Sequence, residues 1–214
     1  MKIVMLGVKG SGKGTYASRL APLLGIPHIS TGDIFRDNIK NGTELGKKVE
    51  EILKAGKFVS DELTIKIVEE RLEEPDCKNG FILDGFPRTP NQADGLNNVE
   101  KLDFVIYLDV LEDVIIRRIS TRVTCKKCKT IYNTEVLKPK EEGICDNCGG
   151  ELYQRDDDKP EIARKRIEQD EKNLKPLLDY YKNKGLLKIV KCVKFNDPPE
   201  NYVNQILEIV GAKE

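Results

Sequence analysis

A glycine-rich segment near the N-terminus constrains the fold of this chain more than any other feature. Residues 7–15 read GVKGSGKGT and stand between an apolar run at 3–6 and a stretch of helical character at 15–24. Because glycines carry no Cβ, several backbone N–H groups can meet one polyphosphate, and the start of a helix favours anions. Lys13 adds a positive charge that reaches the β- and γ-phosphates. The segment therefore predicts a strand, a phosphate-binding loop and a helix, with a plain glycine-rich turn as the alternative.

The loop departs in one place from the general pattern G-x4-G-K-[ST]. Lys13 fits the pattern, but Gly14 takes the position of the hydroxyl residue. The hydroxyl arrives one residue later, as Thr15.

Length and charge limit the classes of protein that remain. At 214 residues the chain can bury a real core as one domain with insertions. Its 36 basic and 36 acidic residues give a net charge of zero, so no overall field attracts nucleic acid or an anionic membrane. No run approaches the roughly 18 apolar residues that span a bilayer, and the N-terminal run is too short for a signal peptide. We expect a cytoplasmic protein without nucleic-acid or membrane partners, and a monomer by default.

Apolar segments with strand character alternate with helical patterns along the whole chain. The predicted strands are at 3–6, around Ile29, at 80–84, at 104–110 and at 186–193. The predicted helices are at 15–24, from about 34, at 43–55, from 61 to before Pro75, at 112–121 and at 199–210. This alternation predicts an α/β fold with a five-stranded parallel sheet, helices on both faces and right-handed crossovers.

Asp84 closes the third predicted strand, and Arg88 follows shortly after it. Ligands collect at the carboxyl ends of parallel strands, and in phosphate-loop enzymes such a carboxylate holds magnesium or its waters. Asp84 is therefore the candidate magnesium ligand. His28, the one histidine of the chain, is assigned no role, because a lone histidine beside a proline is more often packed or solvent-facing.

Four cysteines form two C-x2-C pairs, Cys125 with Cys128 and Cys145 with Cys148, separated by 16 residues. Two such pairs can place four thiolates tetrahedrally around one Zn²⁺ and leave no position for water, which predicts a structural metal site. Two disulfides are the alternative, and a cytoplasmic location disfavours them. A zinc ribbon flanked by lysines also suits a nucleic-acid factor, but the neutral chain lacks a basic stripe interleaved with aromatic residues.

Taken together, these motifs resemble the adenylate kinases, in the long-lid form with a zinc-binding lid, among the nucleoside monophosphate kinases. The resemblance covers essentially the whole chain. It rests on residues 7–15, 30–33 with Arg36, 56–59, 83–88 with Gln92, the four cysteines, Arg155 with Asp158, and 164–166. It implies a P-loop NTPase-like core of residues 1–30, 60–121 and 159–214, an AMP-binding insert of 31–59 and a lid of 122–158. It also implies the reaction ATP + AMP ⇌ 2 ADP, with Mg²⁺ carried on ATP.

The resemblance also implies which residues form the site. Those implied for ATP are Gly10, Ser11, Gly12, Lys13, Gly14, Thr15, Arg122, Ile131 and Tyr132. Those implied for AMP are Thr31, Arg36, Lys57, Phe58, Val59, Gly85, Phe86, Pro87, Arg88, Gln92, Arg155 and Arg166. The implied catalytic set is Lys13, Asp84, Arg88, Arg122, Arg155 and Arg166. Because the acceptor phosphate is already an anion and needs no general base, an arginine-rich site suits transfer without a covalent intermediate.

Two residues depart from the family pattern: Lys9 replaces the usual proline and Tyr16 the usual glutamine. Lys9 is expected either to attract phosphate or to face solvent, and Tyr16 to pack against neighbouring strands. The long lid with its cysteines separates the chain from pyrimidine nucleoside monophosphate kinases, which resemble this core and are the alternative assignment.

Overall fold

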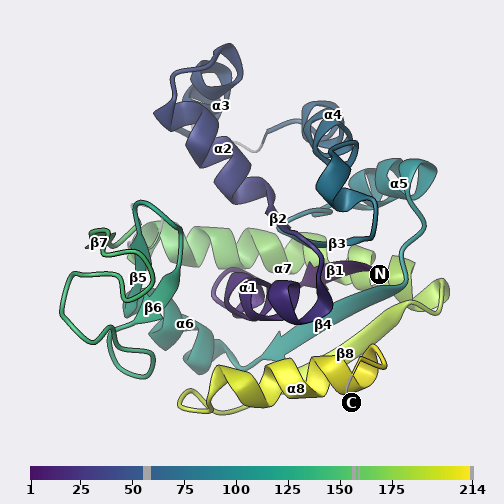
Figure 1. Ribbon diagram of the computed structural model, residues 1–214. Coiled ribbons are helices and arrows are strands. Elements are labelled where there is room, and N and C mark those ends of the chain that lie inside the picture. The colour runs from purple at the N-terminus through teal and green to yellow at the C-terminus, as the bar shows by residue number, and fades with distance from the viewer. Residues whose placement is uncertain (55–58, 156–157, 159, 213–214) are drawn as a thin grey trace.

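The computed structural model describes residues 1–212 except 55–58, 156–157 and 159. Within these residues the chain forms a parallel sheet of five strands in the order β2-β3-β1-β4-β8 (Figure 1). The predicted α/β fold is therefore confirmed. The strands are β1 (Lys2–Leu6), β2 (His28–Ser30), β3 (Phe81–Asp84), β4 (Phe104–Val110) and β8 (Leu187–Cys192).

Strand β1 is the centre of the sheet, and the chain winds outward from it in both directions. It pairs with β3 on one side, with Met5 opposite Asp84, and with β4 on the other, with Leu6 opposite Tyr107. In open parallel sheets, ligands bind in the crevice outside the strand ends where the strand order reverses. The phosphate loop follows β1 directly and therefore lies at this crevice.

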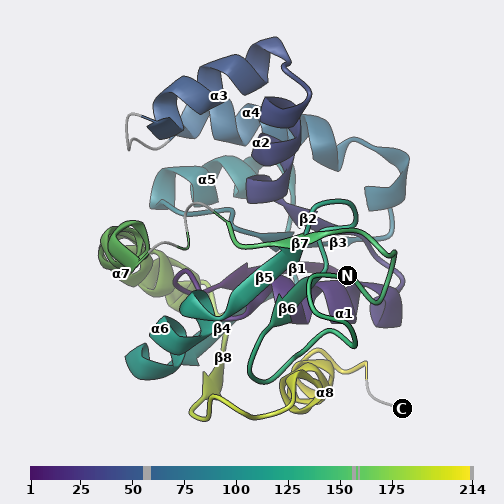
Figure 2. The ribbon, with the colours of Figure 1, turned by 90° about the vertical axis from the view of Figure 1, so that its left-hand side faces the viewer.

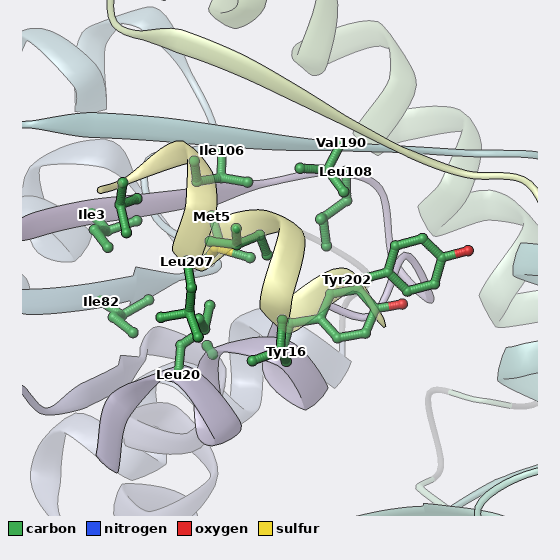
Figure 3. Close-up of a cluster of buried hydrophobic side chains, with 14 of the residues drawn as sticks. Ile3, Met5, Tyr16, Leu20, Ile82, Ile106, Leu108, Val190, Tyr202 and Leu207 are labelled. Atoms are coloured by element: carbon green, nitrogen blue, oxygen red, sulfur yellow. The ribbon is translucent and has the colours of Figure 1, made fainter. Parts of the chain in front are cut away.

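Alternate residues of the strands pack against helices on the two faces of the sheet. Ile3 and Met5 share a core with α1 and α8, which contribute Leu20 and Leu207 (Figure 3). Val4 points to the opposite face, toward α4, α5 and α7. The helices on the two faces are α1 (Lys13–Leu24), α4 (Asp61–Leu72), α5 (Pro90–Val99), α7 (Pro160–Asn183) and α8 (Pro199–Ile209). Among the described residues, no helix combines the length and the apolar character needed to cross a membrane.

Two segments extend from this body. Between β2 and α4, the helices α2 (Thr31–Lys40) and α3 (Glu44–Lys54) pack against each other and project to the top of Figure 1. The other segment follows α6 (Glu112–Ser120) and contains a small antiparallel sheet in the order β6-β5-β7, which faces the viewer in Figure 2. Its strands are β5 (Arg122–Cys125), β6 (Ile131–Asn133) and β7 (Leu152–Tyr153).

The structure contains a helix, α5, that the sequence patterns do not indicate. Its ten residues include three asparagines and Gly95, which are poor helix formers. The Thr89 side chain caps the helix by accepting a hydrogen bond from the backbone N–H of Gln92. A Cβ at Gly95 would lie 2.7 Å from the Ile65 side chain of α4. Close packing between α4 and α5 therefore explains the glycine, and capping with tertiary contact outweighs the weak propensity.

Helix α2 begins at Thr31, earlier than the predicted start at about 34. The Ser30 side chain accepts a hydrogen bond from the backbone N–H of Asp33 and so acts as the N-cap. Thr31 is thus the first residue of the helix.

Ile106 of β4 offers a direct test of this arrangement, because its side chain is 0 % exposed. Ile106→Ala should lower the free energy of unfolding by about 2–5 kcal/mol, since it removes buried methyl groups and leaves a cavity. Ile189→Ala on β8, where the side chain is 52 % exposed, is the matched control and should cost less than about 1 kcal/mol. Equilibrium unfolding in urea, followed by circular dichroism, measures both. Equal losses in the two variants would contradict the assignment of the core.

Candidate active site

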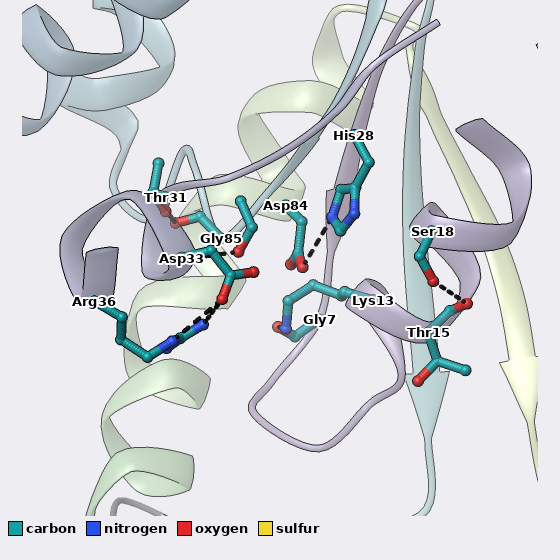
Figure 4. Close-up of polar contacts among 11 residues, drawn as sticks. Gly7, Lys13, Thr15, Ser18, His28, Thr31, Asp33, Arg36, Asp84 and Gly85 are labelled. Carbon is teal, nitrogen blue, oxygen red and sulfur yellow. Dashed lines mark hydrogen bonds and ion pairs between the residues drawn. The ribbon is translucent and has the colours of Figure 1, made fainter. Parts of the chain in front are cut away.

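The phosphate loop joins β1 to α1 and includes backbone conformations that favour glycine. Gly10 and Gly12 have φ angles of 85° and 100°, in the left-handed region. The Lys13 side chain folds over the loop (Figure 4). Its Nζ atom donates hydrogen bonds to the backbone oxygens of Gly7, at 2.7 Å, and Val8, at 3.0 Å. The loop therefore brings an ammonium group and a helix N-terminus to one point, which suits the binding of phosphate.

Contacts from distant parts of the chain explain the glycine at position 14. A Cβ at Gly14 would lie 3.2 Å from Oδ2 of Asp84 and 3.2 Å from Cδ1 of Ile131. The separation from Cδ1 is shorter than the optimal 3.5–4.0 Å or so for carbon contacts, so the side chain of a serine or threonine here would crowd Ile131. Thr15 instead supplies the hydroxyl of the general pattern, and it lines the cavity that opens at the loop.

A cavity of about 770 Å³ opens at the loop and is bounded by the loop, α2, the end of β3 and the segment between α6 and α7. Most of the residues implied for the site line it. They are Gly10, Gly12, Lys13, Gly14, Thr15, Arg36, Asp84, Gly85, Pro87, Arg88, Arg122, Ile131, Tyr132 and Arg155.

Asp84 lies beside Lys13 at the carboxyl end of β3. Nε2 of His28, a residue without a role in the sequence analysis, is 3.5 Å from its Oδ2 atom (Figure 4). Burial by itself would raise the pKa of Asp84, but His28 and Lys13 outweigh it and hold the pKa below its usual value. For Lys13, burial prevails over the attraction of Asp84 and Asp170 and lowers the pKa. The ionised carboxylate gives the cavity an oxygen donor suited to a hard divalent cation.

Two arginines on the α2 and β3 side of the cavity are held by oxygen acceptors of the protein. Arg36 donates through Nε and Nη2 to Oδ1 of Asp33, at 3.2 and 2.6 Å (Figure 4). Nε of Arg88 donates to the backbone oxygen of Gly85 at 2.8 Å. Both guanidinium groups are therefore positioned before any phosphate arrives.

Two further arginines come from the segment between α6 and α7. Nε of Arg122 donates to Oδ2 of Asp158 at 2.8 Å, and its Nη2 pairs with Oδ1 of the same carboxylate. Nε of Arg155 donates to Oγ1 of Thr124 at 3.1 Å. Cations from this segment thus face the phosphate loop across the cavity.

Five residues implied for the site are buried and do not line the cavity: Ser11, Thr31, Val59, Phe86 and Gln92. Oγ1 of Thr31 donates to the backbone oxygen of Gly85 at 2.9 Å. Gln92 donates through Nε2 to Asp61 at 2.7 Å and accepts the backbone N–H of Arg88 at 2.8 Å. In this structure Thr31 and Gln92 therefore support the backbone at 85–88.

Three implied contacts cannot be placed. Lys57, Phe58 and the side chain of Arg166 lie outside the described residues. Their roles in AMP binding and catalysis stay predictions.

Two residues of the cavity wall carry no signal in the local sequence. Nη1 of Arg118 donates to the backbone oxygen of Ser11 at 3.0 Å, but nothing in the sequence separates Arg118 from the adjacent Arg117. Asp170 of α7 accepts the backbone N–H of Lys9 at 2.8 Å. It reaches the cavity only because α7 crosses behind the phosphate loop.

The two departures from the family pattern are both buried. The expectation that Lys9 faces solvent is wrong: its side chain is 8 % exposed, and its Nζ atom lies 3.1 Å from Oδ1 of Asp158 at the edge of the cavity. Tyr16 packs into the sheet core, as predicted, and its ring centroid is 5.5 Å from that of Tyr202 in α8.

The four cysteines of the C-x2-C pairs meet in one cluster beside β5. Their Sγ atoms all lie within 4.8 Å of one another. The distances are 3.5 Å from Cys125 to Cys148 and 3.5 Å from Cys128 to Cys145. Tetrahedral zinc–sulfur bonds of about 2.3 Å place sulfurs roughly 3.8 Å apart, whereas a disulfide bond is about 2.05 Å long. The donor set therefore fits a tetrahedral metal, and the thiols are not paired as disulfides.

The segment that carries this cluster lies over the phosphate loop. Besides the approach of Ile131 to Gly14, Nζ of Lys129 is 2.7 Å from Oδ1 of Asp37 in α2. The segment thus covers the cavity and contacts α2, one of the two helices that project from the sheet.

Comparison with known proteins agrees with this geometry. The family model for adenylate kinase matches residues 5–186, which include both the phosphate loop and the four cysteines. An adenylate kinase of Thermosipho melanesiensis is 54 % identical over 192 residues, covering 87 % of this chain and 90 % of the relative. The adenylate kinase of Archaeoglobus fulgidus is 47 % identical over 217 aligned positions, covering 99 % of this chain and 100 % of the relative. That of Oceanobacillus iheyensis is 46 % identical and covers 100 % of both. The chain therefore belongs to the adenylate kinase family, the phosphotransferases that convert ATP and AMP into two ADP.

Proposed function

We propose that phosphoryl transfer from ATP to AMP takes place in the cavity between the phosphate loop and the lid, residues 122–158. One observation carries this proposal. A lysine at a helix N-terminus and four arginines from separate elements line the same cavity, namely Lys13, Arg36, Arg88, Arg122 and Arg155. No nucleophile or general base is needed, because the AMP phosphate is already an anion and the difficulty lies in bringing negative charges together.

The positions of the cations suggest a division of work. Lys13 and the loop N–H groups bind the ATP phosphates, while Arg36 and Arg88 bind the phosphate of AMP. Arg122 and Arg155 close from the lid onto the transferring group. Each guanidinium is held by a protein acceptor, so little reorganisation is required when charge develops in the transition state.

Magnesium fits the oxygen donors at the end of β3. Asp84 carries an ionised carboxylate next to Lys13, and the Thr15 hydroxyl also lines the cavity. Asp84 would hold the ion or its waters, and Mg²⁺ bound with ATP would supply positive charge that offsets part of the phosphate charge.

Zinc fits the four thiols of the lid, and we assign it a structural role. Four cysteine ligands fill a tetrahedral shell and leave no position for substrate or water. The metal stabilises a segment with few buried apolar residues, so that it moves as a unit. Four reduced thiols suit a reducing compartment, which supports a cytoplasmic enzyme that we take to be a monomer.

The proposed division of the chain follows the same logic. The core is 1–30, 60–121 and 159–214, the AMP-binding insert is 31–59, and the lid is 122–158. Lid closure sequesters the reacting phosphates from water, a motion for which adenylate kinases are themselves a known example.

A coupled assay across the four nucleoside monophosphates with Mg-ATP tests the acceptor. AMP should be phosphorylated fastest. Faster turnover of CMP or UMP would instead favour a pyrimidine nucleotide kinase. ATP hydrolysis stimulated by RNA or DNA, with little AMP-dependent ADP formation, would favour a nucleic-acid factor.

Lys13→Met and Arg88→Ala should each lower kcat by about 10²- to 10³-fold, because each removes a charge that counts most in the transition state. Steady-state kinetics with ATP and AMP measure the effect, and circular dichroism verifies folding. Lys66→Met on α4, where the side chain is 72 % exposed, is the control and should keep wild-type kcat. A near-normal kcat in either site variant would remove that residue from the catalytic set.

Loss of the lid metal should lower the stability of the protein but leave the transfer reaction largely intact. Elemental analysis should find one zinc per chain, and Cys125→Ser should lower the Tm and speed proteolysis within residues 125–150, because the metal holds this segment together. Protein that stays folded should keep substantial activity at moderate temperature.

Cys77→Ser is the matched control, since Cys77 lies outside the metal cluster and should leave the zinc content unchanged. Abolished turnover with unchanged Tm and unchanged lid proteolysis would show that the metal takes part in the chemistry.

A further inference from the structure

We propose that Lys9 is a positioning residue for the lid: it fastens the end of the lid to the phosphate loop and so favours the closed position in which ATP is bound. The observation behind it is the ion pair between Lys9 and Asp158, whose side chains are 8 % and 0 % exposed. The inference rests on the proposed function of the lid and adds to it a residue that governs closure.

Because this ion pair is buried, the loss of one partner has a larger energetic effect than it would in an exposed pair. Exposed ion pairs contribute little, because water and salt screen them. A carboxylate removed from water must instead be compensated by its partners. Asp158 is compensated by Arg122 on one side and by Lys9 on the other. Removing the lysine charge therefore takes away one of the two cations that stabilise the buried carboxylate. Water cannot take the place of this cation while the lid is closed.

Asp158 connects both ends of the lid. Arg122 is the first residue of β5, where the lid begins, and Asp158 stands where the lid ends before α7. Rotation of the lid about its two ends would turn the side chains of Arg122 and Asp158 relative to the phosphate loop. We therefore expect the contact from Lys9 to lengthen or break as the lid opens.

Lys9 is itself anchored on the core side. Its backbone N–H donates to Oδ2 of Asp170, at 2.8 Å, in the long helix α7. Proline, the usual residue of the family at this position, has neither an N–H nor a charge and can make neither contact. The link between loop and lid is therefore a property of the lysine in this chain.

The link should act on affinity rather than on the chemical step. The apparent dissociation constant of a ligand is its intrinsic value divided by the fraction of enzyme in the competent conformation. A contact that raises the closed fraction therefore strengthens ATP binding and slows lid opening. Lys9 need not touch a nucleotide to have this effect.

Lys9→Met removes the charge and keeps the length of the side chain. The KM for ATP should rise about threefold to tenfold, through the smaller closed fraction, while kcat stays equal or increases. Hydrogen exchange of residues 122–134 in the nucleotide-free enzyme should become faster. Lys9→Arg should restore both values, and Lys66→Met should change neither. If Lys9→Met does not fold, Lys9→Gln carries the same expectations.

Either readout remaining at its wild-type value overturns the proposal, as does a fall in kcat at constant KM. The exchange measurement needs no turnover. A wild-type enzyme without AMP-dependent activity would therefore count against the proposed function, while the exchange rates still decide the role of Lys9.

A double-mutant cycle identifies the partner. In the Asp158→Asn background, Lys9→Met should change lid exchange by less than about twofold, because the contact is already lost. An equally large effect in both backgrounds would show that Lys9 does not act through Asp158.

Discussion

Repulsion among cations is the constraint on which the rest of the site depends. In a partly buried medium, two like charges about 6 Å apart repel by about 3 kcal/mol, yet nine of the described lysines and arginines line one cavity. The protein meets this cost with acceptors of its own, since Asp33 binds Arg36, Asp158 binds Arg122, and Asp84 lies beside Lys13. Phosphate thus enters a site whose cations are already oriented, and it adds to these contacts or competes with them for the same donors. The nine are Lys9, Lys13, Arg19, Arg36, Arg88, Arg118, Arg122, Lys129 and Arg155.

The fold brings these groups together because they sit at the ends of elements that converge. Strand β1 leads into the phosphate loop, and its neighbour β3 ends at Asp84, so the lysine and the carboxylate meet at the same edge of the sheet. Arg36 comes from a helix inserted after β2, and Arg122 from the first residue of the lid. Each of these two segments therefore brings its own arginine to the cavity that the phosphate loop borders. The four cysteines meet in a segment with little apolar core, and a tetrahedral metal bound there would hold the arginines of this segment together as one body.

The sequence predicts the parts of this design that are local and leaves out those that depend on packing. The glycines, Lys13 and the apolar strands are recognisable because each belongs to a short pattern with a physical meaning. Helix α5 is missed because three asparagines and Gly95 hide it, and contact with α4 decides its presence. Arg118 and Asp170 are missed for a similar reason, since only the placement of α6 and α7 turns them toward the loop.

Positions 9 and 14 are the places where the loop breaks its expected pattern, and both are explained by contacts with the lid side of the cavity. Gly14 leaves space for Ile131, which descends onto the loop from β6. Lys9 supplies the charge that meets Asp158 at the other end of the lid. At position 14 the absence of a side chain leaves space for Ile131. At position 9 the lysine side chain pairs with Asp158. A residue that departs from its own motif can therefore be explained by a contact with a residue more than a hundred positions away in the sequence. In this chain the phosphate loop meets residues of the 122–158 segment at both positions, so a substitution at either one should be judged by its effect on these contacts as well as on phosphate binding.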